Sequence, residues 1–186
     1  MSKAKPPLAV DLDGTLIRTD LFTRAMAALL ARRPWRAPQL LLWLLRGRAH
    51  AKQKLTALFP IDAAALPYNE ALLSYLRAER AAGRALALAT AFDQAGADAV
   101  ARHLALFDRV FASDGQINLK AHRKAAALAE AYPDGFAYAG NERADLAVWS
   151  GAQAAVVVNA SAALERRAAR LCPIERVFPR QSRNTT

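Results

Sequence analysis

The chain has 186 residues, 54% of them apolar, and a formal net charge of +10 at neutral pH. This length suits one domain with a small inserted lobe, and the apolar content is ample for a buried core. The single cysteine excludes an internal disulfide, no apolar run approaches the ~20 residues of a membrane-spanning helix, and the first residues hold no signal-peptide core. We therefore expect a cytoplasmic protein, either free or peripheral to the inner face of the membrane.

A buried strand is predicted over Leu8–Asp13, and its end carries two carboxylates, Asp11 and Asp13. Successive strand residues point to opposite faces, so these two side chains start on the same side, and Gly14 lets the chain turn away beneath them. Two carboxylates held together repel unless a cation or a shared proton lies between them. The alternative is a solvated turn after a strand, which would fit Asp-Gly alone. The pair with its apolar strand favours a Mg²⁺ site with a carboxylate nucleophile.

Basic charge is concentrated in the segment that follows this strand. Residues 18–54 contain nine Lys or Arg and one acid, a net charge of +8, whereas residues 55–164 have a net charge of −2. A helical pattern runs from residue 20 to residue 59, and we expect breaks at Pro34, Pro38 and Gly47. The segment is therefore predicted to be a helical insert after the first strand.

Strands and helices alternate along the rest of the chain. A helix that is capped near Asn69 and ended by Gly83 comes first. The predicted strands then cover residues 85–90, 109–112, 136–139 and 154–158, with a last short strand at 174–178. The predicted helices cover residues 95–104, 121–132, 143–150 and 162–170. Such alternation indicates a parallel sheet covered on both faces, with its functional residues at the carboxyl ends of the strands.

The residues at those strand ends resemble, in order, the four motifs of the haloacid-dehalogenase-like (HAD) phosphatases. They are Asp11-Leu-Asp-Gly-Thr-Leu16, then Thr90, then Lys120 in Asn-Leu-Lys, and finally Gly140-Asn-Glu-Arg-Ala-Asp145. The resemblance spans residues 8 to about 158. It implies an α/β fold, a Rossmann-like three-layer α/β/α arrangement with a parallel sheet in the order 3-2-1-4-5. It also implies a core domain of residues 1–17 and 67–178, a helical cap at 18–66 and a flexible tail at 179–186.

For the chemistry, the resemblance implies hydrolysis of a small phosphorylated substrate. Asp11 would attack phosphorus and form an aspartyl-phosphate, and Asp13 would protonate the leaving oxygen and then activate water. Thr90 would hydrogen-bond the phosphoryl oxygens. Lys120 would neutralise the carboxylate and phosphate charge. Lys124, one helical turn later, is the alternative to Lys120, which is preferred because it lies at the mouth of the helix.

The resemblance also implies a Mg²⁺ ion bound by Asp11, by the backbone carbonyl of Asp13 and by the motif that contains Asn141 and Asp145. This chain departs from the family pattern, because the first acid of that motif is an asparagine here. An amide oxygen can ligate Mg²⁺ but brings no charge. The metal would therefore depend on Asp11 and Asp145 more than is usual.

The insert contains an apolar run, Leu40–Leu45, that leaves no polar face for nearly two helical turns. One explanation is that the helices of the insert pack on one another. The other is a patch that docks on an anionic membrane surface or a membrane partner, with Trp and Arg in the interfacial zone. Nucleic acid is a poorer explanation, since aromatic residues make up only 8% of the chain.

Further short motifs resemble the HAD domain that precedes UbiA-type polyprenyltransferases in some bacterial fusion proteins. They include Leu66-Pro-Tyr-Asn-Glu70, Ala112-Ser-Asp-Gly115 and Val157-Val-Asn-Ala-Ser161. This closer resemblance implies a phosphatase that acts on a prenyl-linked or sugar phosphate near the membrane. Two alternatives stay open: a non-catalytic or regulatory partner domain of a membrane prenyltransferase, and a phosphotransferase or mutase.

Overall fold

Six parallel strands form one sheet in the order β3-β2-β1-β4-β5-β6 in a computed structural model that describes residues 5–180. The predicted order of five strands is confirmed, and the last short strand extends the sheet beyond β5. The strands are β1 (Leu8–Val10), β2 (Leu86–Asp93), β3 (Arg109–Ser113), β4 (Ala137–Gly140), β5 (Ala154–Val158) and β6 (Ile174–Phe178).

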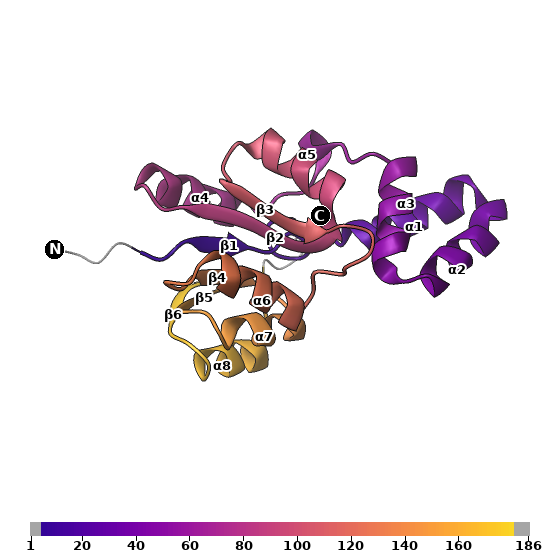
Figure 1. Cartoon of the computed structure of the whole chain (residues 1–186). Helices are drawn as coiled ribbons and strands as arrows, with labels where there is room; N and C mark the ends of the chain where they lie inside the picture. The colour runs from indigo at the N-terminus through magenta and orange to yellow at the C-terminus, as the bar shows by residue number, and fades with distance from the viewer. Residues whose placement is uncertain (1–4, 181–186) are drawn as a thin grey trace.

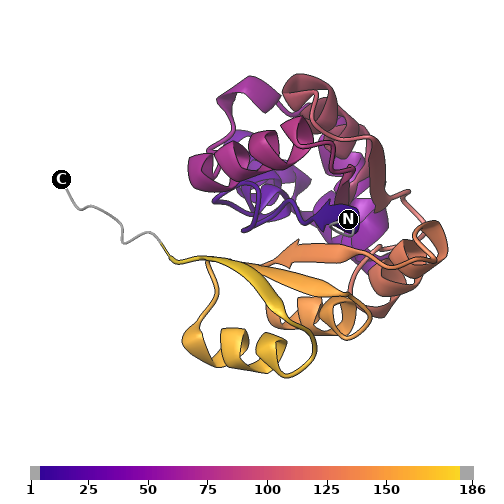
Figure 2. The same ribbon diagram turned by 90° about the vertical axis from the view of Figure 1, so that its left-hand side faces the viewer.

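Helices cover both faces of this sheet, which confirms the three-layer arrangement (Figures 1 and 2). One face carries α4 (Glu70–Ala81) and α5 (Gln94–Leu104). The other face carries α6 (His122–Ala131), α7 (Leu146–Trp149) and α8 (Ala162–Ala169). The predicted helix over 143–150 is in fact a 3₁₀ turn, Arg143–Asp145, followed by the short α7.

The central strand β1 is buried on both faces, as expected for a continuous apolar run in a covered parallel sheet. Leu8 and Val10 pack in the cluster under α4 and α5, whereas Ala9 lies in the cluster under α6, α7 and α8. In that second cluster the indole of Trp149 donates to the backbone carbonyl of Tyr138 at 3.0 Å. These contacts fix the carboxyl end of β1, where the two aspartates follow.

The helical insert (residues 18–66) lies beyond the carboxyl ends of the strands (Figure 1). It contains α1 (Leu21–Arg32), α2 (Ala37–Leu45) and α3 (Arg48–Leu58), with 3₁₀ turns at Pro34–Arg36 and Ala63–Ala65. Breaks occur near Pro34 and at Gly47, which has φ +115°. Pro38 does not break a helix, because it lies in the first turn of α2, where its missing N–H has no helical partner to lose.

Two strand ends differ from the prediction. Regular pairing of β1 stops at Val10, so Asp11 and Asp13 belong to the turn that follows. Strand β2 continues past Thr90 to Asp93, with an irregular register against β3. Most of the predicted tail, residues 181–186, lies outside the described residues. Between Lys5 and Arg180, no helix has the length and apolar character to cross a bilayer.

A partly buried charge cluster connects the edge strand β6 to α4 and to the segment that precedes β2. The guanidinium of Arg84 donates to Glu79 at 2.7 Å and to both carboxylate oxygens of Glu175 at 2.7 and 3.0 Å. The Tyr75 hydroxyl also donates to Glu175 at 2.7 Å. Partial burial alone would raise the pKa of Glu175, but the arginine and the tyrosine outweigh it and lower this pKa to about 2.

Glu175→Gln is expected to lower the free energy of unfolding by about 2 kcal/mol at pH 7. Because the folded-state pKa is depressed below its ordinary value of 4.5, the stabilisation is present above that pH and is lost as pH falls toward 2. Urea unfolding at several pH values should therefore show the difference between wild type and variant shrinking over this window. The exposed Glu130→Gln is the control, and a difference that does not change with pH would contradict the assignment.

Candidate functional site

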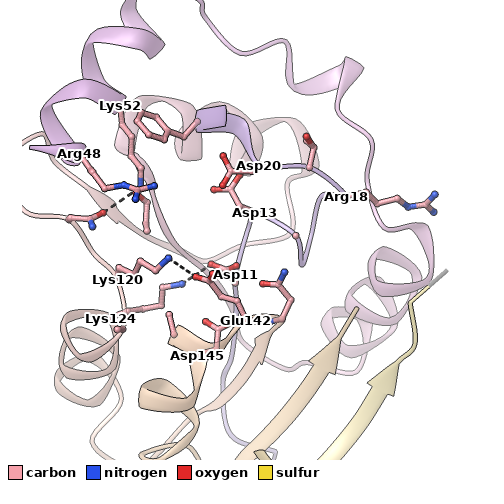
Figure 3. A pocket seen from close by; sticks show the side chains of 18 residues that line it. Asp11, Asp13, Arg18, Asp20, Arg48, Lys52, Lys120, Lys124, Glu142 and Asp145 are labelled. Carbon is pink, nitrogen blue, oxygen red and sulfur yellow. Dashed lines mark hydrogen bonds and ion pairs between the residues drawn. The ribbon is translucent and has the colours of Figure 1, made fainter. Parts of the chain in front are cut away.

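A cavity of about 430 Å³ opens at the carboxyl edge of the sheet, between the sheet and the helical insert. Five of the six predicted site residues line it, from three separate segments of the chain (Figure 3): Asp11, Asp13, Lys120, Asn141 and Asp145. The insert contributes further polar and aromatic side chains to the same cavity: Arg18, Asp20, Phe22, Arg48 and Lys52. The fold therefore brings these residues, which are far apart in the sequence, together around one cavity.

Asp11 is buried at the bottom of this cavity. Its Oδ1 accepts a hydrogen bond from the ammonium of Lys124 at 2.6 Å, and Oδ2 accepts only a long one from the Thr15 hydroxyl, at 3.4 Å. Burial raises the pKa of Asp11 to about 6, against the opposing effect of the lysine. One oxygen is therefore neutralised, and the other is the oxygen more available for reaction.

Asp13 lies on the same side of the turn, as the alternation predicted (Figure 3). Its Oδ1 accepts from the backbone N–H of Leu21, at the start of α1, at 2.8 Å. Burial raises the pKa of Asp13 to about 7, so this carboxyl holds a proton more readily than an exposed one. Glycine is favoured at residue 14, where the turn after Asp13 packs against the loop after β4. Its φ is +74°, and a Cβ there would lie 2.1 Å from Asn141 Nδ2.

Lys124, not Lys120, is the lysine that meets the Asp11 carboxylate, and the preference for Lys120 is corrected on this point. Helix α6 begins at His122, so Lys124 lies in its first turn. Long helical side chains point back toward the amino end, which brings this ammonium into the cavity. Lys120 lies at the rim, where its side chain is 46% exposed and pairs with Glu142 at 2.8 Å.

A buried network connects Lys124 to the loop after β4. The ammonium donates to the Tyr138 hydroxyl at 2.8 Å, and that hydroxyl donates to Asp145 Oδ1 at 2.9 Å. Asp145 Oδ2 accepts the backbone N–H groups of Asn141 at 2.8 Å and Glu142 at 2.9 Å. Both oxygens of Asp145 thus hold the loop after β4 in place while the residue also lines the cavity, and metal binding by Asp145 stays a prediction.

Sequence reasoning missed Tyr138 because it lies inside an apolar strand, where an aromatic residue is ordinary core. The only signal was its phenol oxygen, which needs a partner when buried.

Asn141 presents an oxygen that fits a cation. Its side chain lines the cavity, and its Oδ1 is buried without a hydrogen-bond partner among the described residues. A buried acceptor of this kind is costly unless a donor or a cation meets it. Within residues 5–180 no cluster of three His, Cys, Asp or Glu side chains is arranged to hold a metal. A metal here would therefore use the amide oxygen together with Asp11, an oxygen set that suits Mg²⁺.

Thr90 does not line the cavity. It lies within the extended β2 and is fully buried, and its hydroxyl oxygen accepts the N–H of Phe92 at 2.9 Å. The cavity wall beside it is formed by Ala91. Phosphate binding by Thr90 stays a prediction.

Lys52 of the insert is a further site residue that sequence reasoning did not single out. Its ammonium reaches across to the sheet and donates to the carbonyl of Ala91 and to Asn118 Oδ1, the latter at 3.4 Å. Burial lowers the pKa of Lys52 to about 8. Its position on α3 next to the buried Ala51 was the available signal, since a lysine on an inward face needs a polar partner.

Ala121 carries a strained backbone between the two lysines, with φ +52° and ψ −119°. Residues with a Cβ adopt such a conformation at a cost of ~1–3 kcal/mol. Ala121→Gly is therefore expected to raise the free energy of unfolding by about 1 kcal/mol, after the extra entropy of glycine in the unfolded chain. Urea unfolding tests this, with Ala125→Gly inside α6 as the control that should lose stability. A lower free energy of unfolding in Ala121→Gly than in the wild type would contradict the claim that the backbone at Ala121 is strained.

No protein-family model matches the chain. A curated relative, the uncharacterized protein y4nM of Sinorhizobium fredii, is 40% identical over 154 residues, which are 83% of this chain. The chain spans about 30% of the length of that relative.

Several solved structures share the fold. A protein of unknown function from Bordetella pertussis Tohama I superposes with a TM-score of 0.67 at 20% identity, over 96% of this chain and 100% of the other. A substrate-bound phosphoserine phosphatase superposes with a TM-score of 0.66 at 13% identity, over 97% of this chain and 95% of the other. At these identities the likeness concerns the fold.

Proposed function

We propose that this chain, which has the fold of the HAD-like phosphatases, is a Mg²⁺-dependent phosphomonoester hydrolase. The observation that carries the proposal is the buried ion pair between Asp11 and Lys124, at 2.6 Å, at the bottom of a cavity shared with Asp13 and Asn141. A carboxylate with one oxygen neutralised and the other available can approach an anionic phosphate as a nucleophile.

In the first step the available oxygen of Asp11 attacks phosphorus, and the bond from phosphorus to the ester oxygen breaks. The leaving alkoxide takes a proton from Asp13, whose pKa is raised to about 7 by burial. The product is an alcohol and an aspartyl-phosphate on Asp11. In the second step the Asp13 carboxylate takes a proton from water, the hydroxide attacks the aspartyl-phosphate, and inorganic phosphate leaves.

A bound Mg²⁺ would supply positive charge between the carboxylate and the phosphoryl oxygens. Asp11, the unpartnered Oδ1 of Asn141 and the Asp13 backbone carbonyl would hold it, with Asp145 positioning the loop. Lys124 neutralises negative charge on Asp11 through its hydrogen bond to Oδ1.

The helical insert would act as a cap that selects the substrate. It supplies Arg48 and Lys52 to the cavity, and both favour an anionic substrate. A prenyl-linked or sugar phosphate is the substrate class that we propose from the resemblance to domains fused to prenyltransferases. The phosphoserine phosphatase structures support only the coarser class of small phosphorylated compounds.

Metal removal tests the proposal. Chelation with EDTA is expected to lower the hydrolysis of a generic aryl phosphomonoester by at least ~100-fold, because the phosphate and carboxylate charges then repel one another. Added Mg²⁺ should restore the rate, and calorimetry with Mg²⁺ alone should detect binding that Asn141→Leu weakens. Hydrolysis that continues unchanged in EDTA would contradict the metal requirement.

A second candidate function is that of a non-catalytic partner domain of a membrane protein. The presence of an amide at residue 141 favours it, because one charge of a Mg²⁺ site is absent. Phosphate release distinguishes the two candidate functions. A partner domain releases no phosphate above background from any member of a panel of sugar, prenyl-linked and aryl phosphates, whereas a phosphatase releases phosphate from at least one of them.

A further inference from the structure

Helix α2 is apolar on all sides, and only part of it is covered. Leu40 and Trp43 are buried against the rest of the insert. In contrast, Leu41, Leu42 and Leu45 are 59%, 60% and 75% exposed. Residues three and four apart on a helix are surface neighbours, so these three leucines form one continuous patch, which we call the α2 face. Packing within the insert therefore explains half of the apolar run and leaves the other half open.

The α2 face lies at an outer end of the molecule. Helix α2 contacts α3 and the turn before it and is the helix of the insert farthest from the sheet (Figure 1). The turn leading into it carries Trp35, which is 72% exposed. Trp35 is the only exposed tryptophan, since Trp43 and Trp149 are buried.

Arginines stand at both ends of the helix. Arg33 and Arg36 precede α2, and Arg46 follows it directly. In the part of the chain from residue 5 to residue 180, none of the three is ion-paired with an acid. The nearest acids in sequence are Asp20, which caps α1 through the N–H of Thr23, and Asp62, which accepts the N–H of Ala64. The ends of α2 therefore carry three positive charges that no acid of the described residues pairs, within a segment whose net charge is +8.

We propose that the α2 face docks the protein on an anionic phospholipid bilayer. Leucines that point outward, flanked by arginines and a tryptophan, suit the boundary between headgroups and acyl chains. A second copy of the chain is a poor occupant, because a symmetric contact would bring two segments of charge +8 together. The surface is separate from the phosphoryl site, so the proposal stands independently of the proposed function.

Cosedimentation with vesicles tests this docking. The wild type should bind phosphatidylcholine vesicles that contain roughly one-third phosphatidylglycerol, and should not bind pure phosphatidylcholine vesicles. Leu41→Ser/Leu45→Ser should weaken binding at least ~tenfold. The matched control, Ile117→Ser/Leu171→Ser, removes two exposed apolar side chains elsewhere and should bind as the wild type does.

Two further measurements separate the charge from the apolar contact. Arg36→Ser/Arg46→Ser should weaken binding to anionic vesicles by roughly fivefold per charge. Tryptophan fluorescence should shift to the blue on binding, and Trp35→Phe should abolish the shift. No binding of the wild type to anionic vesicles overturns the proposal and leaves an acidic protein partner as the occupant. Equal binding to both vesicle types, or no loss in the leucine variant, overturns it as well.

Discussion

Asp11→Asn is expected to lower kcat for a phosphomonoester by on the order of 10⁴-fold, because it removes the proposed nucleophile and leaves Asp13 in its separate role as general acid. An amide keeps an oxygen at the position that accepts from Lys124, so the hydrogen bond of 2.6 Å has a substitute. The amide does not form an acyl phosphate under these conditions. The loss should therefore appear in kcat with little change in KM, as measured by steady-state release of phosphate.

The control for this variant is Asp134→Asn, which makes the same chemical change at an exposed position outside the cavity. It should retain the wild-type rate. Near-ultraviolet circular dichroism on both variants checks that the uncompensated charge of Lys124 has not unfolded the site. Equal, background-level phosphate release by the wild type and Asp11→Asn would remove the phosphatase proposal and favour the partner domain.

Most of the sheet could be predicted because its strands are continuous apolar runs between clear breaks. The run Leu8–Val10 is short, and the acidic pair and Gly14 locate its end to within three residues, since the strand was predicted to reach Asp13 and stops at Val10. Alternation of strands and helices then predicts a parallel sheet, since parallel strands need helical crossovers, whereas the strand order was implied by the family resemblance. The end of β2 was harder to place, because Ala91 and Phe92 are as compatible with a strand as with a loop.

The site was predicted less completely, because the sequence does not show which side chains extend far enough to contact one another. Spacing identified Asp11 and Asp13, because residues two apart on an extended segment share a side. Spacing could not decide between the two lysines, since that depends on where α6 begins and on the backward tilt of its side chains. Asp145 was a plausible ligand from its charge alone. Nothing in the sequence indicated that its oxygens also accept the Tyr138 hydroxyl and the backbone N–H groups of residues 141 and 142.

In the insert, too, the sequence pattern predicted the helices but not which of their side chains are buried. The run Leu40–Leu45 predicted either packing within the insert or a docking patch, and the structure buries Leu40 and Trp43 while Leu41, Leu42 and Leu45 stay exposed. Its sequence could not tell which residues point inward, because every position is apolar. Of the two tryptophans in the insert, Trp43 is buried and Trp35 is exposed.

Lys124→Met is expected to lower kcat/KM by roughly 10³-fold, whereas Lys120→Met should cost less than about fivefold. The first variant removes the charge that neutralises Asp11 from within the buried site, and the pKa of Asp11, already about 6, should rise further. A larger fraction of the nucleophile would then be protonated at neutral pH. The activity of Lys124→Met should accordingly recover in part as pH rises from 6 to about 8, which a purely structural defect would not produce.

Lys120→Met is the matched control, because it removes the same charge from the rim, where solvent screens its pair with Glu142. Both variants keep most of the length and apolar volume of the side chain, so packing changes little. Urea unfolding of each variant separates a loss of fold from a loss of chemistry. A larger catalytic loss in Lys120→Met than in Lys124→Met would return the charge-neutralising role to Lys120. It would also mean that substrate binding rearranges the first turn of α6.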